Sequence, residues 1–414
     1  MKRILFLLLL IALPLQAQSN LLKMEKKRFT AGSAVDLDGT AEYMSKNSPV
    51  NLDLNGAERI TNAADRDFST LVNWAVLGDA SNKIGRSSVD KHAGTYSMVD
   101  TTSGAGSTTN CVNLPYANFT ALGTDANSIY EKYTLELWAR ATNAGCKITI
   151  SIGGKSVQSG NLSTTTGAFT KVVFNFQATA NEINQPIKLY LNQADVIYLD
   201  DVSLTKAWDM LVNVWINHAD QNLTVNERIL YGLSSSGYFR IMGTASQQYP
   251  QIGLKDNDGI GADLLFSDLD VNTGAYNLLT AKINSTATNG ILFYKNGVVS
   301  TAYYTRTAGK TNLSSLLIGS QAAINTYFSG QIGEVQIIKF TDIAQSNVNT
   351  STLLQAYRGG LSTWSGGSPQ IVAWYDFRGN SDSQMLRDKS GNGNNLTGTN
   401  VTTADQVRGT YPSK

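Results

Sequence analysis

The sequence predicts an all-β, turn-rich protein, and three observations lead to this fold class. Many runs of four to eight residues alternate between apolar and polar side chains, and each run is bounded by Gly, Asn, Asp or Ser. Charged residues make up only 16% of the chain, whereas 36 of its 414 residues are glycine. Helical periodicity is convincing only over Asn349 to Tyr357. These features are typical of β-sandwiches and jelly rolls, and the chain is long enough for about two or three domains.

The predicted strands are spread along most of the chain. Two turn sequences, Asn296-Gly297 and Asp258-Gly259, favour tight hairpins because Asn, Asp and Gly tolerate left-handed backbone angles. The clearest runs with a period of two are Tyr133 to Ala139, Lys147 to Ile152, Lys171 to Phe176, Ile187 to Leu191, Ile291 to Tyr294 and Glu334 to Phe340.

The charges are balanced along the chain. Lys and Arg number 33 and Asp and Glu number 32, so the formal net charge is +1. Neither a basic patch nor an acidic tail is present in the sequence, and polyanions bind through such basic patches. Nucleic acid is therefore not expected as a partner.

The N-terminus has the pattern of a secretory signal peptide over residues 1–19. A positive start, Met1-Lys2-Arg3, precedes an apolar run from Ile4 to Leu13, and small residues follow it. Cleavage after Ala17 and cleavage after Ser19 both fit. The apolar run is half the length of about 20 residues that a membrane-spanning helix needs. We therefore expect a secreted, extracellular or cell-surface protein without a membrane span.

The two cysteines, Cys111 and Cys146, lie 35 residues apart, and export would permit a disulfide between them. The alternative is two buried thiols that pack as small apolar side chains. Neither flank has the spacing of a zinc site or a redox motif, so both interpretations stay open.

Two discontinuous parts of the chain, 28–59 and 207–360, resemble laminin-G-like, concanavalin A-like jelly rolls. The opening strands are Ala34 to Met44, with the run Val-Asp-Leu-Asp-Gly. The pattern resumes at Met210 to Ile216, which has a Trp on the strand, and ends with the closing strand Phe328 to Ile338. The resemblance implies one jelly roll that is interrupted by another domain.

The interrupting segment, 60–206, resembles the β-sandwich carbohydrate-binding modules of secreted glycanases. The matching stretches are His92 to Met98, the strand Tyr133 to Ala139 that ends in Trp-Ala, and the closing strand Ile197 to Leu204. The ends of a sandwich often lie close together, so such a module can be inserted into a surface loop.

The tail, residues 361–414, contains Val372 to Phe377 and an Asn- and Gly-rich turn, Asp388 to Asn395, that resemble the start of a jelly roll. The tail is too short for another domain. We expect it to add strands to the existing sandwich or to meet a partner chain, including a second copy of this one.

Sugar-binding sandwiches stack pyranose rings on aromatic side chains. The residues predicted to bind a ligand in the inserted module are Trp74, Tyr116, Phe119 and Tyr130. The alternative for each of them is core packing, which is the common fate of large aromatic side chains.

Asp200 is the candidate metal ligand, because the first Asp of the Asp200-Asp201 pair helps to hold a structural Ca²⁺ in the resembling family. Oxygen ligands suit this cation. The alternative is a carboxylate that caps a bulge. The acidic loop Asp256 to Asp263 lacks the glutamate of an EF-hand, so it is interpreted as a solvated hairpin.

Catalysis is not expected. A glycosidase needs two carboxylates about 5 to 10 Å apart, and the sequence shows only isolated acids such as Glu136 and Glu334. Neither His92 nor His218 lies near a nucleophile motif.

The first functional hypothesis is therefore a secreted, non-catalytic protein that binds glycans or polysaccharides by aromatic stacking. The alternative is a structural or adhesion subunit of a larger surface assembly, such as a virion decoration or fibre protein. A divergent glycanase is a third possibility. Because a fold does not dictate a function, the sequence leaves this choice open.

Overall fold

The structure is a computed structural model, and its described residues are 33–39, 41–50, 52–53, 55–78, 83–124, 130–218, 227–233, 238–244, 247–256, 258–271, 274–311, 315–321, 326–340 and 370–408. The signal peptide predicted over residues 1–19 and the helix predicted over Asn349 to Tyr357 lie outside these ranges. Within them, no helix is long and apolar enough to cross a membrane.

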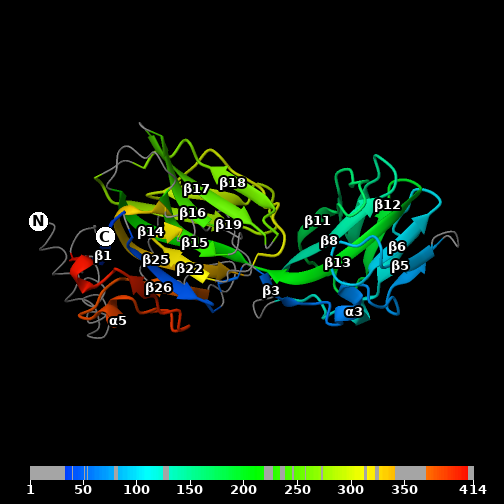
Figure 1. Cartoon of the computed structure of the whole chain (residues 1–414), viewed down its shortest axis with the longest axis horizontal. Helices are drawn as coiled ribbons and strands as arrows, with labels where there is room; N and C mark the ends of the chain where they lie inside the picture. Colours follow the sequence, from blue (N-terminus) through cyan, green and yellow to red (C-terminus); the bar gives the residue numbers. More distant parts are fainter. Residues whose placement is uncertain are drawn as a thin grey trace, which may run out of the picture.

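The all-β prediction is confirmed, and the strand pairs between the described strands are antiparallel. Each of the six clearest predicted runs coincides with an observed strand, although the strand that matches Lys147 to Ile152 begins at Ile148. Figure 1 shows two bodies side by side, which we call the first and the second sandwich. The described helices are short: α3 (Ala63–Arg66), α5 (Asp382–Met385), η1 (Tyr116–Asn118) and η5 (Thr403–Asp405).

The first sandwich consists of two large sheets. The eight-stranded sheet has the order β21 (Val298–Val299), β20 (Ile291–Lys295), β19 (Asn277–Ile283), β14 (Asp209–His218), β25 (Ser329–Phe340), β1 (Ser33–Asp38) and β28 (Gln406–Arg408), with β26 (Gln370–Tyr375) paired to β25. The seven-stranded sheet has the order β18 (Gly261–Leu265), β17 (Gln247–Lys255), β16 (Tyr238–Thr244), β15 (Glu227–Leu233), β22 (Ser315–Ile318), β2 (Tyr43–Asn47) and β27 (Thr397–Thr399). A small pair, β23 (Ser320–Gln321) and β24 (Thr326–Tyr327), lies between β22 and β25 in the chain.

The second sandwich also consists of two sheets. The five-stranded sheet has the order β10 (Lys155–Gln158), β9 (Ile148–Ile152), β12 (Ile187–Leu191), β7 (Cys111–Leu114) and β4 (Ala75–Leu77). The six-stranded sheet has the order β11 (Thr170–Gln177), β8 (Lys132–Ala141), β13 (Asp195–Ala207), β6 (Ser97–Thr102) and β5 (Lys83–Ser87), with β3 (Asn55–Glu58) paired to β13.

The N-terminal strands belong to the first sandwich, although the second sandwich separates them from the rest of it in the sequence. β1 lies between β25 and β28, and β2 lies between β22 and β27. The second sandwich therefore sits in a connection of the first. The described tail strands β26, β27 and β28 also pair within the first sandwich, which is the first of the two outcomes expected for the tail.

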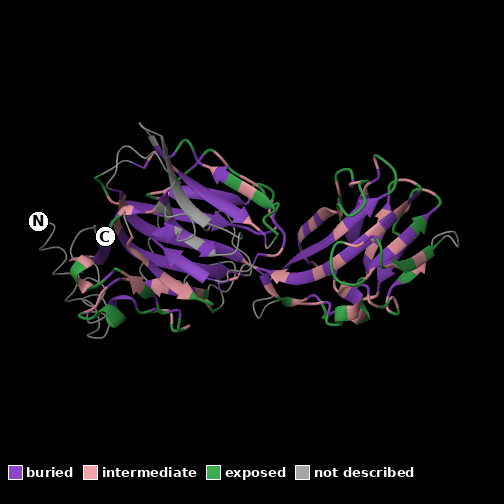
Figure 2. Ribbon diagram, in the orientation of Figure 1, coloured by how far each residue is buried: buried purple, intermediate pink, exposed green. Residues whose placement is uncertain are grey.

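Each sandwich has its own apolar core. Figure 2 shows that the central parts of the strands are buried in both sandwiches, whereas the exposed residues lie mostly in the loops. In the second sandwich, Leu135 and Leu137 on β8 face Ile150 and other apolar side chains of the five-stranded sheet. Because side chains alternate along a strand, Glu136 and Trp138 point to the opposite face of β8. The outer face of this sheet is thus lined by polar and aromatic residues.

The two sandwiches are joined where the chain crosses between them. The segment before β3 leads into the second sandwich, and the end of β13 leads back through Trp208 into β14. The crossing strands β3 and β13 pair with each other. The outgoing and the returning chain therefore lie together at the junction.

Ion pairs are buried at this junction. The ammonium of Lys132, on β8, lies 2.7 Å from Asp209 at the start of β14, and both side chains are almost inaccessible. Lys171, on β11, lies 2.8 Å from Asp256 of the first sandwich and 3.3 Å from Glu136. A charge that loses its partner in such a place is strongly destabilising, by about 3–5 kcal/mol. These pairs therefore hold the two sandwiches in one arrangement.

The loop Arg306 to Thr311 of the first sandwich continues this contact. The guanidinium of Arg306 donates to Asn55 Oδ1 at 2.9 Å, and the amide of Lys310 donates to Glu136 Oε2 at 2.7 Å. Gly309 lies so close to Glu136 that a Cβ added to it would be 2.0 Å from Glu136 Oε2. Any larger residue at this position would require the Glu136 carboxylate to shift.

We predict that Gly309→Ala lowers the free energy of unfolding by about 1–3 kcal/mol, because the added methyl group overlaps the Glu136 carboxylate. Urea denaturation followed by circular dichroism measures this change. Gly85→Ala on β5 is the matched control, since nothing lies within 4 Å of a Cβ there. Equal midpoints for both variants would show that the loop does not contact Glu136.

A second prediction concerns Asp100, whose side chain is buried on β6 and whose Oδ1 has no hydrogen-bond partner among the described residues. Burial raises the pKa of Asp100 to about 7. The folded state therefore binds this proton more tightly than the unfolded state, where the pKa is about 4. The protonated Asp100 carboxyl therefore stabilises the folded state fully below about pH 4, and this stabilisation is lost as the pH rises through 7.

Asn carries no charge at any of these pH values. Asp100→Asn should therefore abolish the decrease in stability at high pH and raise the free energy of unfolding at pH 8 by up to about 4 kcal/mol. Denaturation series between pH 4 and pH 8 measure the effect, with the exposed Asp36→Asn as the control. If the two variants have the same pH profile, Asp100 is not buried as described.

Candidate functional site

Two of the four predicted ligand-binding residues lie in the core. Trp74 and Phe119 are only 4% and 6% exposed. The ring of Trp74 packs against Phe68 at 5.3 Å between centroids, and its Nε1 donates to the Asp65 carbonyl at 3.0 Å. Neither ring has a face open to a ligand. The interpretation of Trp74 and Phe119 as a stacking platform is therefore corrected: both are packing residues of the second sandwich.

The other two predicted residues do not form a platform with them. Tyr116 lies on η1 and is 48% exposed. Tyr130 is partly buried just before β8, where its carbonyl accepts a hydrogen bond from Gln177 Nε2 at 3.0 Å. Of the four rings, only that of Tyr116 is widely exposed.

The Asp200 carboxylate is engaged by backbone amides. Its Oδ2 accepts from the amides of His92 and Ala93 at 2.8 and 3.1 Å, and its Oδ1 accepts from the amide of Asp201 at 2.9 Å. Burial and the nearby charge of Asp201 raise the pKa of Asp200 to about 6, against the lowering effect of these amides. Asp201 has a positive φ of 50°, and the pairing register of β13 shifts after Asp200.

This arrangement does not fit the predicted calcium ligand. Amide hydrogens point at the oxygens that a cation would need, and Asp201 is bound to His92 Nδ1 at 2.7 Å. Within the described ranges, no group of three or more His, Cys, Asp or Glu side chains is placed to hold a metal ion. Asp200 instead caps the bulge in β13, so we derive no role for Ca²⁺ here.

The two cysteines are free and buried, so the disulfide considered for Cys111 and Cys146 is not formed. Burial raises the pKa of both thiols, that of Cys146 to about 12 with a contribution from Asp195. Both thiols therefore stay protonated and pack as small side chains, which was the alternative interpretation.

An aromatic cluster lies on the outer face of the six-stranded sheet. His92 stacks on Trp138 with 3.9 Å between ring centroids and 13° between planes, and Phe169 meets His92 edge-on at 6.0 Å. The ammonium of Lys171 lies 5.7 Å from the Trp138 ring. His92 therefore covers one face of the Trp138 indole.

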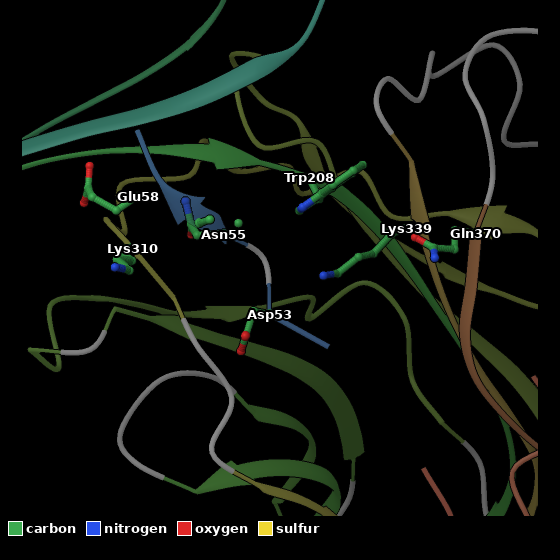
Figure 3. A pocket seen from close by; sticks show the side chains of 9 residues that line it. Asp53, Asn55, Glu58, Trp208, Lys310, Lys339 and Gln370 are labelled. Carbon is green, nitrogen blue, oxygen red and sulfur yellow. The ribbon is translucent and has the colours of Figure 1, made fainter. Parts of the chain in front are cut away.

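A cleft at the junction of the two sandwiches is the candidate functional site. Its volume is about 480 Å³. The crossing segments, the loop around Lys310 and the ends of β25 and β26 supply its walls (Figure 3). It is lined by Asp53, Asn55, Gly56, Ala57, Glu58, Trp208, Lys310, Lys339 and Gln370.

Trp208 is the aromatic residue of the cleft. It is the single residue between β13 and β14, and it is half-buried. The ammonium of Lys206 lies 4.2 Å from its ring centroid, and that of Lys339 lies 5.7 Å away. The ring is thus held in place by packing and by cation–π contacts.

Lys339 reaches the cleft from the end of β25. It follows Val335 and Ile337 on the inward face of that strand, but it lies beyond the apolar core. Its side chain is 4% exposed. Burial lowers the pKa of Lys339 to about 8, although the charge of Asp53 acts in the opposite direction. Figure 3 shows Lys339 extending into the space between Trp208 and Asp53.

Glu58 lies on another wall of the cleft, and its carboxylate is already engaged. Its Oε1 accepts from the amides of Arg59, Ile60 and Leu204, and its Oε2 accepts from Ser203 Oγ. The guanidinium of Arg66 lies 3.9 Å away. Glu58 therefore serves the β3–β13 connection rather than a ligand.

Sequence reasoning missed the residues of this cleft. Asp53, Trp208 and Lys339 are far apart in the chain and belong to no recognised motif. A usable signal was nevertheless present: Trp208 follows the predicted domain boundary at residue 206, and ligand sites occur preferentially between domains.

Comparisons with known proteins give only distant similarities. No protein-family model matches the chain, and no curated protein does. Among solved structures, the chain is similar to the CBM22-1–GH10 modules of xylanase 10B from Clostridium thermocellum, with 13% identity and a TM-score of 0.28 over 37% of this chain and 29% of that chain. It thus spans less than a third of that chain.

Two further structures are similar over about the same share of the chain. TmCBM61, in complex with β-1,4-galactotriose, has 18% identity and a TM-score of 0.24 over 36% of this chain and 99% of that chain. The binding domain of botulinum neurotoxin serotype D has 13% identity and a TM-score of 0.27 over 37% and 38%. At these TM-scores the matches assign no ligand to any residue here, and the resemblance to laminin-G-like jelly rolls stays a prediction.

Proposed function

We propose that this is an exported, non-catalytic carbohydrate-binding protein whose site is the cleft between the two sandwiches. The observation that carries the proposal is an indole ring, Trp208, in a cleft of about 480 Å³ with polar side chains around it. Ligand sites of this volume combine apolar area with a few polar groups that set orientation. The cleft has both components.

The indole supplies the apolar contact. A pyranose ring presents a face of C–H groups that packs on an aromatic ring, and an indole offers a large area with little entropy to lose. Trp208 is positioned by the strands on both sides of it and by Lys206 at 4.2 Å. A platform held in this way needs little ordering when a sugar binds.

The polar groups supply orientation. Sugar hydroxyls donate to carboxylate and amide oxygens and accept from amide and ammonium groups. Asp53 lies across the cleft from Lys339, whereas Gln370 lies beside Lys339 on the paired strand β26 (Figure 3). Hydroxyl groups on a sugar that rests on Trp208 can therefore be bound from more than one side.

The proposal includes the absence of catalysis. Glycoside hydrolysis needs a carboxylic acid and a second carboxylate on either side of the scissile bond. The acids that line the cleft are Asp53 and Glu58, and the oxygens of Glu58 are occupied by amides and by Ser203. Glu58 is therefore held in place for a structural role and is not the second acid of a catalytic pair with Asp53.

The alternative is a structural or adhesion subunit of a larger surface assembly, with the tail donated to a neighbour. In the described part of the tail, β26, β27 and β28 pair with strands of their own chain. These strands are therefore not available for donation. Size-exclusion chromatography with light scattering separates the two functions, because assembly predicts large stoichiometric oligomers.

Binding to a glycan array tests the proposal, with the mature chain as the probe. We expect selective binding that Trp208→Ala weakens at least about 10-fold, because truncation of a central aromatic anchor has effects of this size. Trp208→Phe keeps a ring and should retain part of the affinity. Thermal unfolding of each variant shows whether it is folded.

Tyr116→Ala serves as the comparison, because Tyr116 is the exposed member of the group predicted from the sequence. Loss of binding with Tyr116→Ala and full binding with Trp208→Ala would move the site to the second sandwich. Failure of the wild-type protein to bind any glycan would leave the assembly subunit as the better explanation.

A further inference from the structure

The ammonium of Lys339 is buried, and in the described part of the chain it forms no ion pair. Lys339 is 4% exposed, and its interactions with the described residues are a cation–π contact and an electrostatic effect, not a salt bridge. The Trp208 ring lies 5.7 Å from its ammonium, and the charge of Asp53 acts on it as well. A buried ammonium in this state is costly, since lysine is rarely buried without a partner.

The other buried lysines of the junction differ in this respect. Lys132 lies 2.7 Å from Asp209, and Lys171 lies 2.8 Å from Asp256. The fold therefore supplies carboxylates to the lysines that join the sandwiches. Lys339 is directed into the cleft instead, where an anionic group of a ligand can approach it.

The charge balance of the cleft favours an anion. The negative charge of Glu58 is offset by the guanidinium of Arg66, 3.9 Å away, and Lys206 is paired with Glu131. The other charged residues that line the cleft are Lys310, Lys339 and Asp53. Two positive charges thus face one negative charge, in a place where desolvation strengthens electrostatic interactions.

Lys339 and Trp208 lie close enough to act on one ligand. With the ammonium 5.7 Å from the ring centroid, a sugar stacked on the indole brings its substituents to Lys339. We propose that the cleft is selective for acidic saccharides, with a carboxylate or sulfate group of the sugar bound by Lys339 while the sugar ring rests on Trp208. This inference rests on the carbohydrate-binding function proposed above.

An anionic substituent also explains the mixture of groups in the cleft. The ammonium of Lys339 donates a charge-assisted hydrogen bond to the carboxylate or sulfate of the sugar. Asp53, on the other side of the space in Figure 3, accepts hydrogen bonds from hydroxyl groups of the same sugar. A neutral sugar would use Trp208 and Asp53 but would leave the ammonium unpaired.

Isothermal titration calorimetry of the mature chain tests the inference with three matched oligosaccharides. They are hexagalacturonate, its carboxyl-reduced neutral counterpart, and a sulfated form of the neutral chain. We expect at least one acidic form to bind about 10-fold more tightly than the neutral one, because hydrogen bonds to charged groups have effects of this size. The carboxylate and sulfate arms show which anion Lys339 prefers.

Lys339→Met is the decisive variant. It removes the ammonium but keeps most of the side-chain volume, and it should fold because it removes a buried charge. The preference for the acidic sugar should disappear while affinity for the neutral sugar is kept. Lys339→Arg keeps the charge and should keep the preference. Lys83→Met on β5 is the matched control, since it removes one positive charge from an exposed position outside the cleft.

Three results would overturn the inference. Equal affinity of the wild-type protein for acidic and neutral sugars would reject acidic selectivity and leave the proposed function intact. An acidic preference that survives Lys339→Met would assign the anion to another residue. Absence of binding to all three oligosaccharides would reject the inference, and the proposed function would be rejected with it only if the glycan array also shows no binding.

Discussion

The buried ion pairs at the junction are the constraint on which the rest of the structure depends. Lys132 with Asp209, and Lys171 with Asp256 and Glu136, join side chains of the two sandwiches out of contact with water. Apolar contacts alone permit sliding, because they have little directional preference. Buried charges do not, because each must keep its partner. The relative position of the two sandwiches is therefore determined by polar contacts.

The candidate site exists because of this arrangement. The cleft has walls from both sandwiches, and Trp208 lies at the crossing between them. The loop Arg306 to Thr311 supports one wall, since it is bound to Asn55 on β3 and to Glu136 on β8. A site supported in this way is organised before a ligand arrives, which reduces the ordering that binding requires.

The contrast among the lysines shows how the same residue type takes different roles in one region. Lys132 and Lys171 are buried beside carboxylates of the same chain and contribute to the arrangement of the sandwiches. Lys339 is equally buried, but it faces the cleft and has a lowered pKa of about 8 because of burial. Burial and the direction of the side chain, rather than residue type, separate a structural lysine from a candidate binding residue.

The sequence by itself determined the all-β fold and the location of its main strands, because alternation of apolar side chains and turn residues such as Asn296-Gly297 are local signals. It did not determine the environment of single side chains. Trp74 and Phe119 are buried, and Asp200 is capped by amides, because these outcomes depend on which strands pack together. The cleft was decided by the tertiary structure alone. Trp208, Lys339 and Asp53 are separated by up to 286 positions in the chain (339 − 53), and only the packing of the two sandwiches brings them together.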